Sequence, residues 1–283
     1  MKNPATDYEN LLFTTVRIET SYPDNQMSSG TGFLISYDRE DDLKEIFLIT
    51  NKHVIDGGIN WKLLFNVTDD SSSRGKPIIG EHTGADIGNA RECWIKHPQY
   101  DIALLYFNQI YKILERNKRP PFIRTIGYKS IPSQDEINTK IDAIEDVLVI
   151  GYPNALYDQK SLIPIVRQGI TATPFSVDFY NEPKFLIDAS IFPGSSGSPV
   201  LICDRNLLYK KGGWNTDKRT FLLGIVAETY FTQESNDIIE LEIPVTKKQI
   251  VQTHQMIDLG IVYKSSIIKS MIDSIISSGK YYP

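Results

Sequence analysis

The chain has 283 residues, a formal net charge of −5 and a pI of about 5.5, and 23% of its residues are charged. No dense stripe of Lys and Arg appears, so a nucleic-acid partner is not expected. No run reaches the ~18 apolar residues of a membrane-spanning helix, and the N-terminus lacks the pattern of a secretory leader. We therefore expect a globular protein of the cytoplasm that does not contact a membrane.

Short apolar stretches of strand length follow one another along most of the chain, separated by turns rich in Gly, Asn, Asp and Ser. They lie at 12–18, 32–36, 46–50, 61–67, 102–107, 147–150, 184–187, 199–203 and 221–227. This spacing favours an all-β fold, a sandwich or barrel with two cores, over alternating β and α units. Residues 108–133 are poor in strand signals and contain three prolines, so they are the expected connector between the two units.

The end of the chain has a different pattern. From Lys247 onward apolar residues recur at helical spacing, most clearly in 265–278. The polar face is not strongly basic, so the pattern predicts a helix packed on the β-structure rather than a membrane element. We therefore divide the chain into residues 1–125, which include the connector from about 108, residues 126–250, and a C-terminal helical segment at 251–283.

The two cysteines, Cys93 and Cys203, are far apart in the sequence. Two such residues predict neither a disulfide framework nor a metal site. Each stands next to an apolar residue, Trp94 or Ile202, so buried free thiols are expected.

One segment in the C-terminal third has the composition that a nucleophilic serine needs. Residues 192–200 are Phe-Pro-Gly-Ser-Ser-Gly-Ser-Pro-Val. Gly194 keeps the backbone beside a substrate carbonyl free of a side chain, and Gly197 lets the chain turn away directly after Ser196. If Ser196 is a nucleophile, a histidine and a carboxylate must stand elsewhere in usable positions.

Only one of the four histidines has a suggestive setting. His53 follows an apolar strand, 46–50, at the tip of a short polar turn, whereas the other three histidines (His82, His97 and His254) are expected to be structural. Asp101 begins the apolar segment 101–105, where a partly buried carboxylate could accept the Nδ1 proton of an imidazole. Taken singly, each of these residues has a plain structural explanation, but together with Ser196 they predict a catalytic triad.

The three segments resemble those of chymotrypsin-fold, trypsin-like serine proteases. Residues 50–54 (Thr-Asn-Lys-His-Val) are similar to the family's histidine block, residues 101–105 to its Asp-Ile-Ala-Leu block, and residues 194–199 to its Gly-x-Ser-Gly-x-Pro block. They occur in the order His, Asp, Ser that this family requires. Residues 188–197, together with 29–35, 223–226 and 243–245, resemble the bacterial HtrA/Deg-type branch most closely.

This resemblance implies an all-β fold of two six-stranded antiparallel β-barrels, chymotrypsin-like, with a C-terminal helix. The first barrel would supply His53 and Asp101, and the second would supply Ser196 and the specificity pocket. The implied activity is that of a serine endopeptidase, which hydrolyses peptide bonds of a protein or peptide substrate through an acyl-enzyme. The amides of Gly194 and Ser196 would form the oxyanion hole, and neither a metal nor another cofactor is expected.

The resemblance also indicates which residues meet the substrate side chain. Ser190 would lie at the floor of the pocket, and Ala227, Glu228 and Thr229 would form a wall that pairs with the substrate backbone. Because the floor carries no carboxylate, small or medium uncharged side chains are expected at the cleavage site.

Two departures from the family's pattern narrow the expected mode of activation and the expected domain content. Ser195 stands where digestive proteases carry the aspartate that binds a newly cut N-terminus, so activation by N-terminal insertion is not expected. The stretch after Ile250 is too short for the PDZ module that usually follows the protease in HtrA proteins.

Two other functions stay open at this point. One is a partner-gated or inactive binding and scaffold protein on the same fold, which would need a regulatory protein partner. The other is an acyl hydrolase that acts on esters through the same residues.

Overall fold

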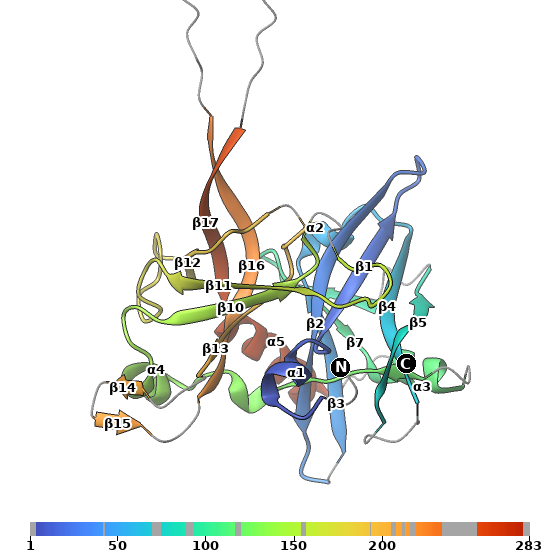
Figure 1. Ribbon diagram of the computed structural model, residues 1–283, viewed down its shortest axis with the longest axis horizontal. Coiled ribbons are helices and arrows are strands. Elements are labelled where there is room, and N and C mark those ends of the chain that lie inside the picture. Colours follow the sequence, from blue (N-terminus) through green and yellow to red (C-terminus); the bar gives the residue numbers. More distant parts are fainter. Residues whose placement is uncertain are drawn as a thin grey trace, which may run out of the picture.

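The computed structural model describes residues 4–41, 43–69, 75–88, 93–116, 120–153, 157–192, 194–204, 208–210, 213–215, 219–233 and 254–279. Two β-units stand side by side, and the helix α5 (Ser265–Ser278) lies between and behind them (Figure 1). The predicted all-β, chymotrypsin-like fold with a C-terminal helix is confirmed. None of the described helices has the length and apolarity to cross a membrane.

The N-terminal unit is one nine-stranded sheet, not the predicted six-stranded barrel. Its strands follow the order β5-β4-β1-β2-β3-β7-β6, with β8 beside β4 and β9 beside β2. The two ends of this path share one core, because the rings of Trp61 and Trp94 lie 6.2 Å apart and Ala85 joins them, so the sheet curls round on itself. The strands are β1 (Thr15–Ser21), β2 (Met27–Asp38), β3 (Lys44–Thr50), β4 (Asn60–Thr68), β5 (Pro77–Asp86), β6 (Trp94–Lys96), β7 (Ala103–Tyr106), β8 (Pro121–Phe122) and β9 (Ile126–Gly127).

Short helices complete this half of the molecule. They are α1 (Asp7–Leu11), α2 (Lys52–Ile55), α3 (Asn108–Arg116) and a 3₁₀ turn (Tyr128–Ser130), whereas the next helix, α4 (Gln134–Lys140), packs Ile137 on the core of the C-terminal unit. Two of the strands, β8 and β9, lie within the predicted connector and pair with the first sheet. The connector is therefore part of the N-terminal unit, and that unit extends beyond residue 125.

The C-terminal unit is the closed six-stranded barrel that the resemblance implied, in the order β10-β11-β12-β17-β16-β13. A small hairpin, β14 with β15, stands outside it. Arg219, the residue directly before β16, is buried and binds two carboxylates, Glu145 at 2.9 Å and Asp204 at 2.7 Å. The strands are β10 (Asp146–Gly151), β11 (Ile165–Thr171), β12 (Lys184–Asp188), β13 (Pro199–Cys203), β14 (Leu208–Lys210), β15 (Gly213–Asn215), β16 (Thr220–Gln233) and β17 (His254–Lys264).

The prediction of a helical segment at 251–283 is wrong for residues His254–Lys264. Residues His254–Lys264 form β17, which pairs with β12 and β16 and closes the barrel, and the helix begins only at Ser265. Ile261 and Val262 are adjacent in β17 and are both buried. When both faces of a strand are buried, the apolar residues do not alternate with polar ones, so the sequence pattern does not distinguish a strand from a helix. The barrel therefore ends at Lys264 rather than at residue 250.

A third apolar core joins the two units. It combines Phe33 of β2, Ile49 of β3 and Leu201 of β13 with Ile268 and Ile272 of α5. Helix α5 therefore packs against both units where they meet. The close packing of this shared core holds the facing loops of the two units in one arrangement.

The two cysteines are free in the structure, but the prediction that both are buried is wrong. Cys93 is exposed and Cys203 is half-buried. An apolar neighbour in the sequence did not determine their burial, because Trp94 and Ile202 are buried in the cores while Cys93 lies just before β6 and Cys203 is the last residue of β13.

Candidate active site

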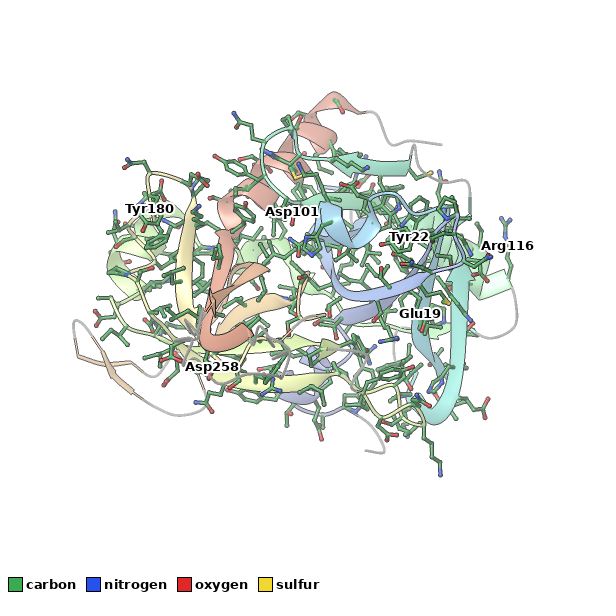
Figure 2. All side chains as sticks on the ribbon, turned by 90° about the horizontal axis from the view of Figure 1, so that it is seen from above. Glu19, Tyr22, Asp101, Arg116, Tyr180 and Asp258 are labelled. Atoms are coloured by element: carbon green, nitrogen blue, oxygen red, sulfur yellow. The ribbon has the colours of Figure 1, made fainter. Side chains whose placement is uncertain are left out.

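The structure brings His53 and Asp101 together at the seam between the two units. Both oxygens of the Asp101 carboxylate accept from His53, Oδ2 from the ring Nδ1 at 2.5 Å and Oδ1 from the backbone amide at 3.0 Å. The side chain of Asp101 is 21% exposed and that of His53 is 49% exposed. The carboxylate therefore orients the ring with its proton on Nδ1, which leaves Nε2 as an open acceptor on the solvent side. In Figure 2, Asp101 lies near this seam, whereas Glu19 lies on the N-terminal unit and Asp258 on the C-terminal barrel.

Neighbouring residues hold this pair in place. His53 belongs to the one-turn helix α2. Asn51, the residue directly before this helix, donates its side-chain amide to the carbonyl of Asp101 at 2.7 Å. On the other side, Lys52 Nζ donates to the carbonyl of His97 at 3.0 Å. The histidine turn and the aspartate turn are thus cross-linked twice, in addition to the bonds of the pair itself.

His97 stabilises the turn that carries Asp101. Its Nδ1 accepts from the amides of Gln99 and Tyr100 at 3.1 and 3.0 Å, and its own amide donates to Ile102. Burial, with the charge of Lys52 as the second cause, holds the pKa of His97 below the ordinary histidine value. The ring is therefore neutral, as two bonds accepted at Nδ1 require. The prediction that His97 is structural agrees with this geometry, but its role beside Asp101 had no signal in the sequence.

The nucleophile loop, residues 192–198, turns after Ser196, as Gly197 predicts. Gly194 has a φ of 88° and Gly197 a φ of 87°, both in the region that favours glycine. The amide of Ser195 donates to the carbonyl of Phe192 at 2.9 Å, and a positive φ at the third residue of such a turn is the mark of type II geometry. Ser195 itself is buried, and its hydroxyl accepts from the amide of Phe192, so it is a structural residue.

Thr31 of β2 attaches the nucleophile loop to the N-terminal sheet. Its amide donates to the carbonyl of Ser196 at 3.1 Å, and its hydroxyl donates to the carbonyl of Gly194 at 3.3 Å while accepting from the amide of Tyr152 at 2.9 Å. Its own carbonyl accepts from the hydroxyl of Thr50, the residue before Asn51, at 2.7 Å. A continuous chain of bonds therefore runs from the loop of Ser196 to the turn of His53 across the seam.

The hydroxyl of Ser196 does not bind His53 in this structure. It donates instead to the carbonyl of Ala227 in β16, at 3.2 Å. The amides of Gly194 and Ser196 donate to no acceptor within the described part of the chain. The loop thus presents two open amide donors beside a serine whose side chain faces the barrel strand.

The structure describes the side chains of two of the four predicted pocket residues. Ala227 is buried and accepts from Ser196, and Ser190 is half-buried between β12 and the nucleophile loop. Glu228 and Thr229 continue β16 and pair with Ile261 and Gly260, but their side chains lie outside the described part of the structure, as does the segment 243–245. Among the described residues, no three His, Cys, Asp or Glu side chains gather as a metal site would require.

Comparison with known proteins agrees with this geometry. The sequence profile of the trypsin-like peptidase domain matches residues 30–208. No curated protein matches the chain.

Two solved structures with TM-scores of 0.50 show the same fold at low sequence identity, and a third is similar at a lower score. The HtrA-type protease AlgW is 16% identical, with a TM-score of 0.50 over 95% of this chain and 62% of that chain, so the chain spans less than two thirds of its length. The inactivated scabies mite protease paralogue S-I1 is also 16% identical, with a TM-score of 0.50 over 98% of this chain and 99% of that chain. The serine endoprotease from Yersinia pestis is 17% identical, with a TM-score of 0.47 over 97% and 68% of the two chains.

The matched profile covers more than half of the chain and includes the histidine, aspartate and serine segments. The resemblance to HtrA-like members of the trypsin-like proteases is therefore confirmed at the level of family and fold. The chain belongs to the trypsin-like peptidase family.

Proposed function

We propose that this protein is a serine endopeptidase in which Ser196 is the nucleophile, His53 the general base and acid, and Asp101 the residue that orients the base. The main support for the proposal is that both carboxylate oxygens of Asp101 accept hydrogen bonds from His53, at 2.5 and 3.0 Å. A surface histidine needs no such double restraint, whereas a catalytic base must present Nε2 in one direction.

The chemistry follows from these positions. Ser196 Oγ attacks the carbonyl carbon of the scissile bond while its proton passes to Nε2 of His53, and Asp101 stabilises the imidazolium that forms. The amides of Gly194 and Ser196 donate to the oxyanion, and each such donor is worth about 3 kcal/mol in enzymes of this mechanism. His53 then gives the proton to the leaving amine, which leaves an ester on Ser196. A water molecule, deprotonated by His53, hydrolyses this ester and restores the serine.

Substrate binding itself supplies the step that prepares Ser196. The hydroxyl is bonded to the carbonyl of Ala227, on the strand β16 that would pair with a peptide substrate. A backbone amide of the substrate that donates to this carbonyl displaces the serine hydroxyl. The hydroxyl then rotates about the Cα–Cβ bond toward Nε2 of His53. Activation in this way makes a peptide a better substrate than a small ester, which lacks the amide.

The half-buried Ser190 supports a preference for small or medium uncharged side chains at the cleaved bond. A library of peptides that vary at this position tests the preference directly. We expect Ala, Val, Ser and Thr to be favoured. A profile dominated by Arg or Lys would contradict this assignment of the pocket while leaving the triad untouched.

Labelling with a fluorophosphonate probe, followed by hydrolysis of a peptide library, tests the proposed activity. The wild type should be labelled, and Ser196→Ala should lose both labelling and hydrolysis. Ser270→Ala is the matched control, because Ser270 is an exposed serine of α5 and its loss should change neither readout. Retention of peptide hydrolysis by Ser196→Ala would refute the proposal.

The second candidate is a binding protein whose protease site is closed until a partner opens it. Two observations favour it, namely the bond of Ser196 to Ala227 rather than to His53, and the likeness of the fold to an inactivated protease paralogue. An unlabelled wild type that still binds peptides would support this candidate. Labelling together with peptide hydrolysis would exclude it.

A further inference from the structure

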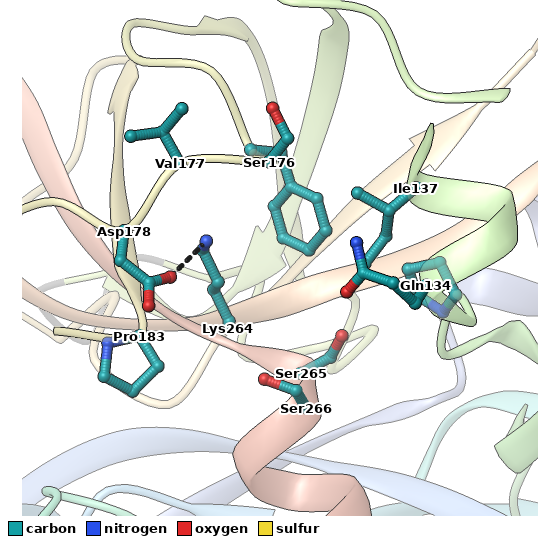
Figure 3. Close-up of a pocket in the computed structure, with 11 residues that line it drawn as sticks. Gln134, Ile137, Ser176, Val177, Asp178, Pro183, Lys264, Ser265 and Ser266 are labelled. Carbon is teal, nitrogen blue, oxygen red and sulfur yellow. Dashed lines mark hydrogen bonds and ion pairs between the residues drawn. The ribbon is translucent and has the colours of Figure 1, made fainter. Parts of the chain in front are cut away.

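A cavity of about 560 Å³ opens on the C-terminal unit, where the start of α5 meets α4 and the segment 175–183. Figure 3 shows its polar and apolar walls, with Lys264 and Ser265 at the base. Its residues are distinct from those of the candidate active site. A volume of this size suits a small organic molecule.

Positive charge gathers at the base of this cavity. Lys264 is the last residue of β17, is 8% exposed, and directs its ammonium group over the ring of Phe175, 5.4 Å from the ring centroid. Lys264 is also the N-cap of α5, a helix of 14 residues. No side chain caps the first amides of this helix and its first turn carries no acidic residue, so the positive end of the helix dipole faces the cavity without compensation.

A second, independent observation comes from Ser265. This residue is 1% exposed, and its Oγ has no hydrogen-bond partner among the described residues. In Figure 3 the hydroxyl points from the start of α5 into the space that Gln134 and Lys264 border. A buried hydroxyl without a partner costs about 1–3 kcal/mol, so its retention at the wall of a cavity indicates an acceptor that enters there.

The wall also has an apolar part, beside the polar side chains of Gln134, Ser176 and Ser266. This part consists of Phe175, Ile137 and Val177, together with Pro132 and Pro183. An inorganic anion would leave these groups in contact with water, whereas an organic anion would cover them.

We infer that this cavity binds a small organic carboxylate. Its oxygens accept from the first amides of α5, from Ser265 Oγ and from the ammonium group of Lys264, and its apolar body rests on Phe175 and Ile137. Asp178 is the internal competitor, because its exposed carboxylate lies 2.6 Å from Lys264 Nζ. The entering carboxylate replaces Asp178 as the partner of this ammonium group, and Asp178 returns to solvent.

Titration of the ¹⁵N-labelled full chain with phenylacetate, followed by two-dimensional NMR, tests the inference. We expect saturable shifts of the amides of Ser265, Ser266 and Ile267. Phenylacetamide, which has the same shape without the charge, should bind at least about tenfold more weakly, as should inorganic phosphate, which lacks the apolar body.

Three variants test which residues bind the carboxylate and which compete with it. Lys264→Met should weaken phenylacetate binding about tenfold, whereas Lys269→Met, a lysine one turn further along α5 and outside the cavity wall, should not change it. Asp178→Asn should bind phenylacetate more tightly, because the competing carboxylate is gone. If Lys264→Met does not fold, the exposed Asp178→Asn decides alone.

Several results would overturn the inference. They are no saturable shift at the start of α5, equal binding of phenylacetamide, equal binding of phosphate, equal effects of the two lysine variants, and unchanged or weaker binding by Asp178→Asn. None of them bears on the proposed peptidase activity, since the titration reads binding at a site that contains no triad residue.

Discussion

Replacing Thr31 with valine removes one hydroxyl group and nearly keeps the volume of the side chain. The hydroxyl is fully buried at the seam, where it donates to the carbonyl of Gly194 and accepts from the amide of Tyr152. Thr31→Val leaves the amide of Tyr152 buried without an acceptor. This loss should lower the free energy of unfolding by about 1–3 kcal/mol, since an unsatisfied buried donor costs that much.

The same variant should also slow the chemistry. The lost bond to the carbonyl of Gly194 frees the peptide that follows the proposed oxyanion donor, while both amide donors remain present. We therefore expect a fall of about tenfold in the rate of fluorophosphonate labelling, less than the ~100-fold that follows loss of a complete donor. Peptide hydrolysis should fall in kcat more than in KM, because the donors act on the transition state.

Thr31→Ser is the matched control, because it keeps the hydroxyl and loses only a methyl group. Urea unfolding measures the stability of each variant, and labelling kinetics measure the reactivity of Ser196. The reasoning fails if Thr31→Val unfolds and reacts like the wild type. It also fails if Thr31→Ser is impaired as strongly as Thr31→Val, because the methyl group rather than the hydroxyl would then carry the effect.

Other variants probe the loop, the aspartate turn and the barrel. Gly197→Ala should prevent native docking of the nucleophile loop, because the new Cβ would lie 1.8 Å from the carbonyl oxygen of Thr31. The control, Gly57→Ala, lies at an open position with a similar φ and should lower the free energy of unfolding by only about 1 kcal/mol. Urea unfolding compares the two variants. Burial holds the pKa of His97 below its ordinary value, so the unfolded chain takes up a proton first, near about pH 6.5, and the free energy of unfolding should fall as the pH drops from 7 through this value. His97→Gln should flatten that fall, and an unchanged pH profile would contradict the assignment. Arg219→Met leaves two carboxylates without their buried partner and should cost about 3–5 kcal/mol of stability in the same assay; a loss below about 1 kcal/mol would argue against the network.

Much of the candidate site could be predicted from local sequence patterns. A histidine after an apolar strand, an aspartate at the start of another, and a serine between glycines each carry their chemistry in a few adjacent residues. The turn at Gly197 was expected for the same reason, and its positive φ is one that glycine adopts freely.

No local sequence pattern indicated the residues that hold the site in position. Asn51, His97 and Thr31 act through bonds to segments distant in the sequence, and an isolated Asn, His or Thr is common in any turn or strand. The strand at His254–Lys264 was missed because its apolar spacing also fits a helix, and only its pairing with β12 and β16 decides between the two. The cavity at α5 is lined by Asp178, Ser265 and Ile137, which belong to three segments distant in the sequence.

The sequence by itself determined the all-β class, the C-terminal helix and the identity of the three residues proposed for catalysis, because each depends on spacing and side-chain chemistry within short segments. Only the tertiary structure decided that Asp101 holds His53 through both carboxylate oxygens, that the hydroxyl of Ser196 rests on the carbonyl of Ala227, and that Thr31 connects the two units. These are contacts across the packed seam of two sheets. Their geometry is fixed by how the sheets and α5 share one core, and no short stretch of sequence contains that information.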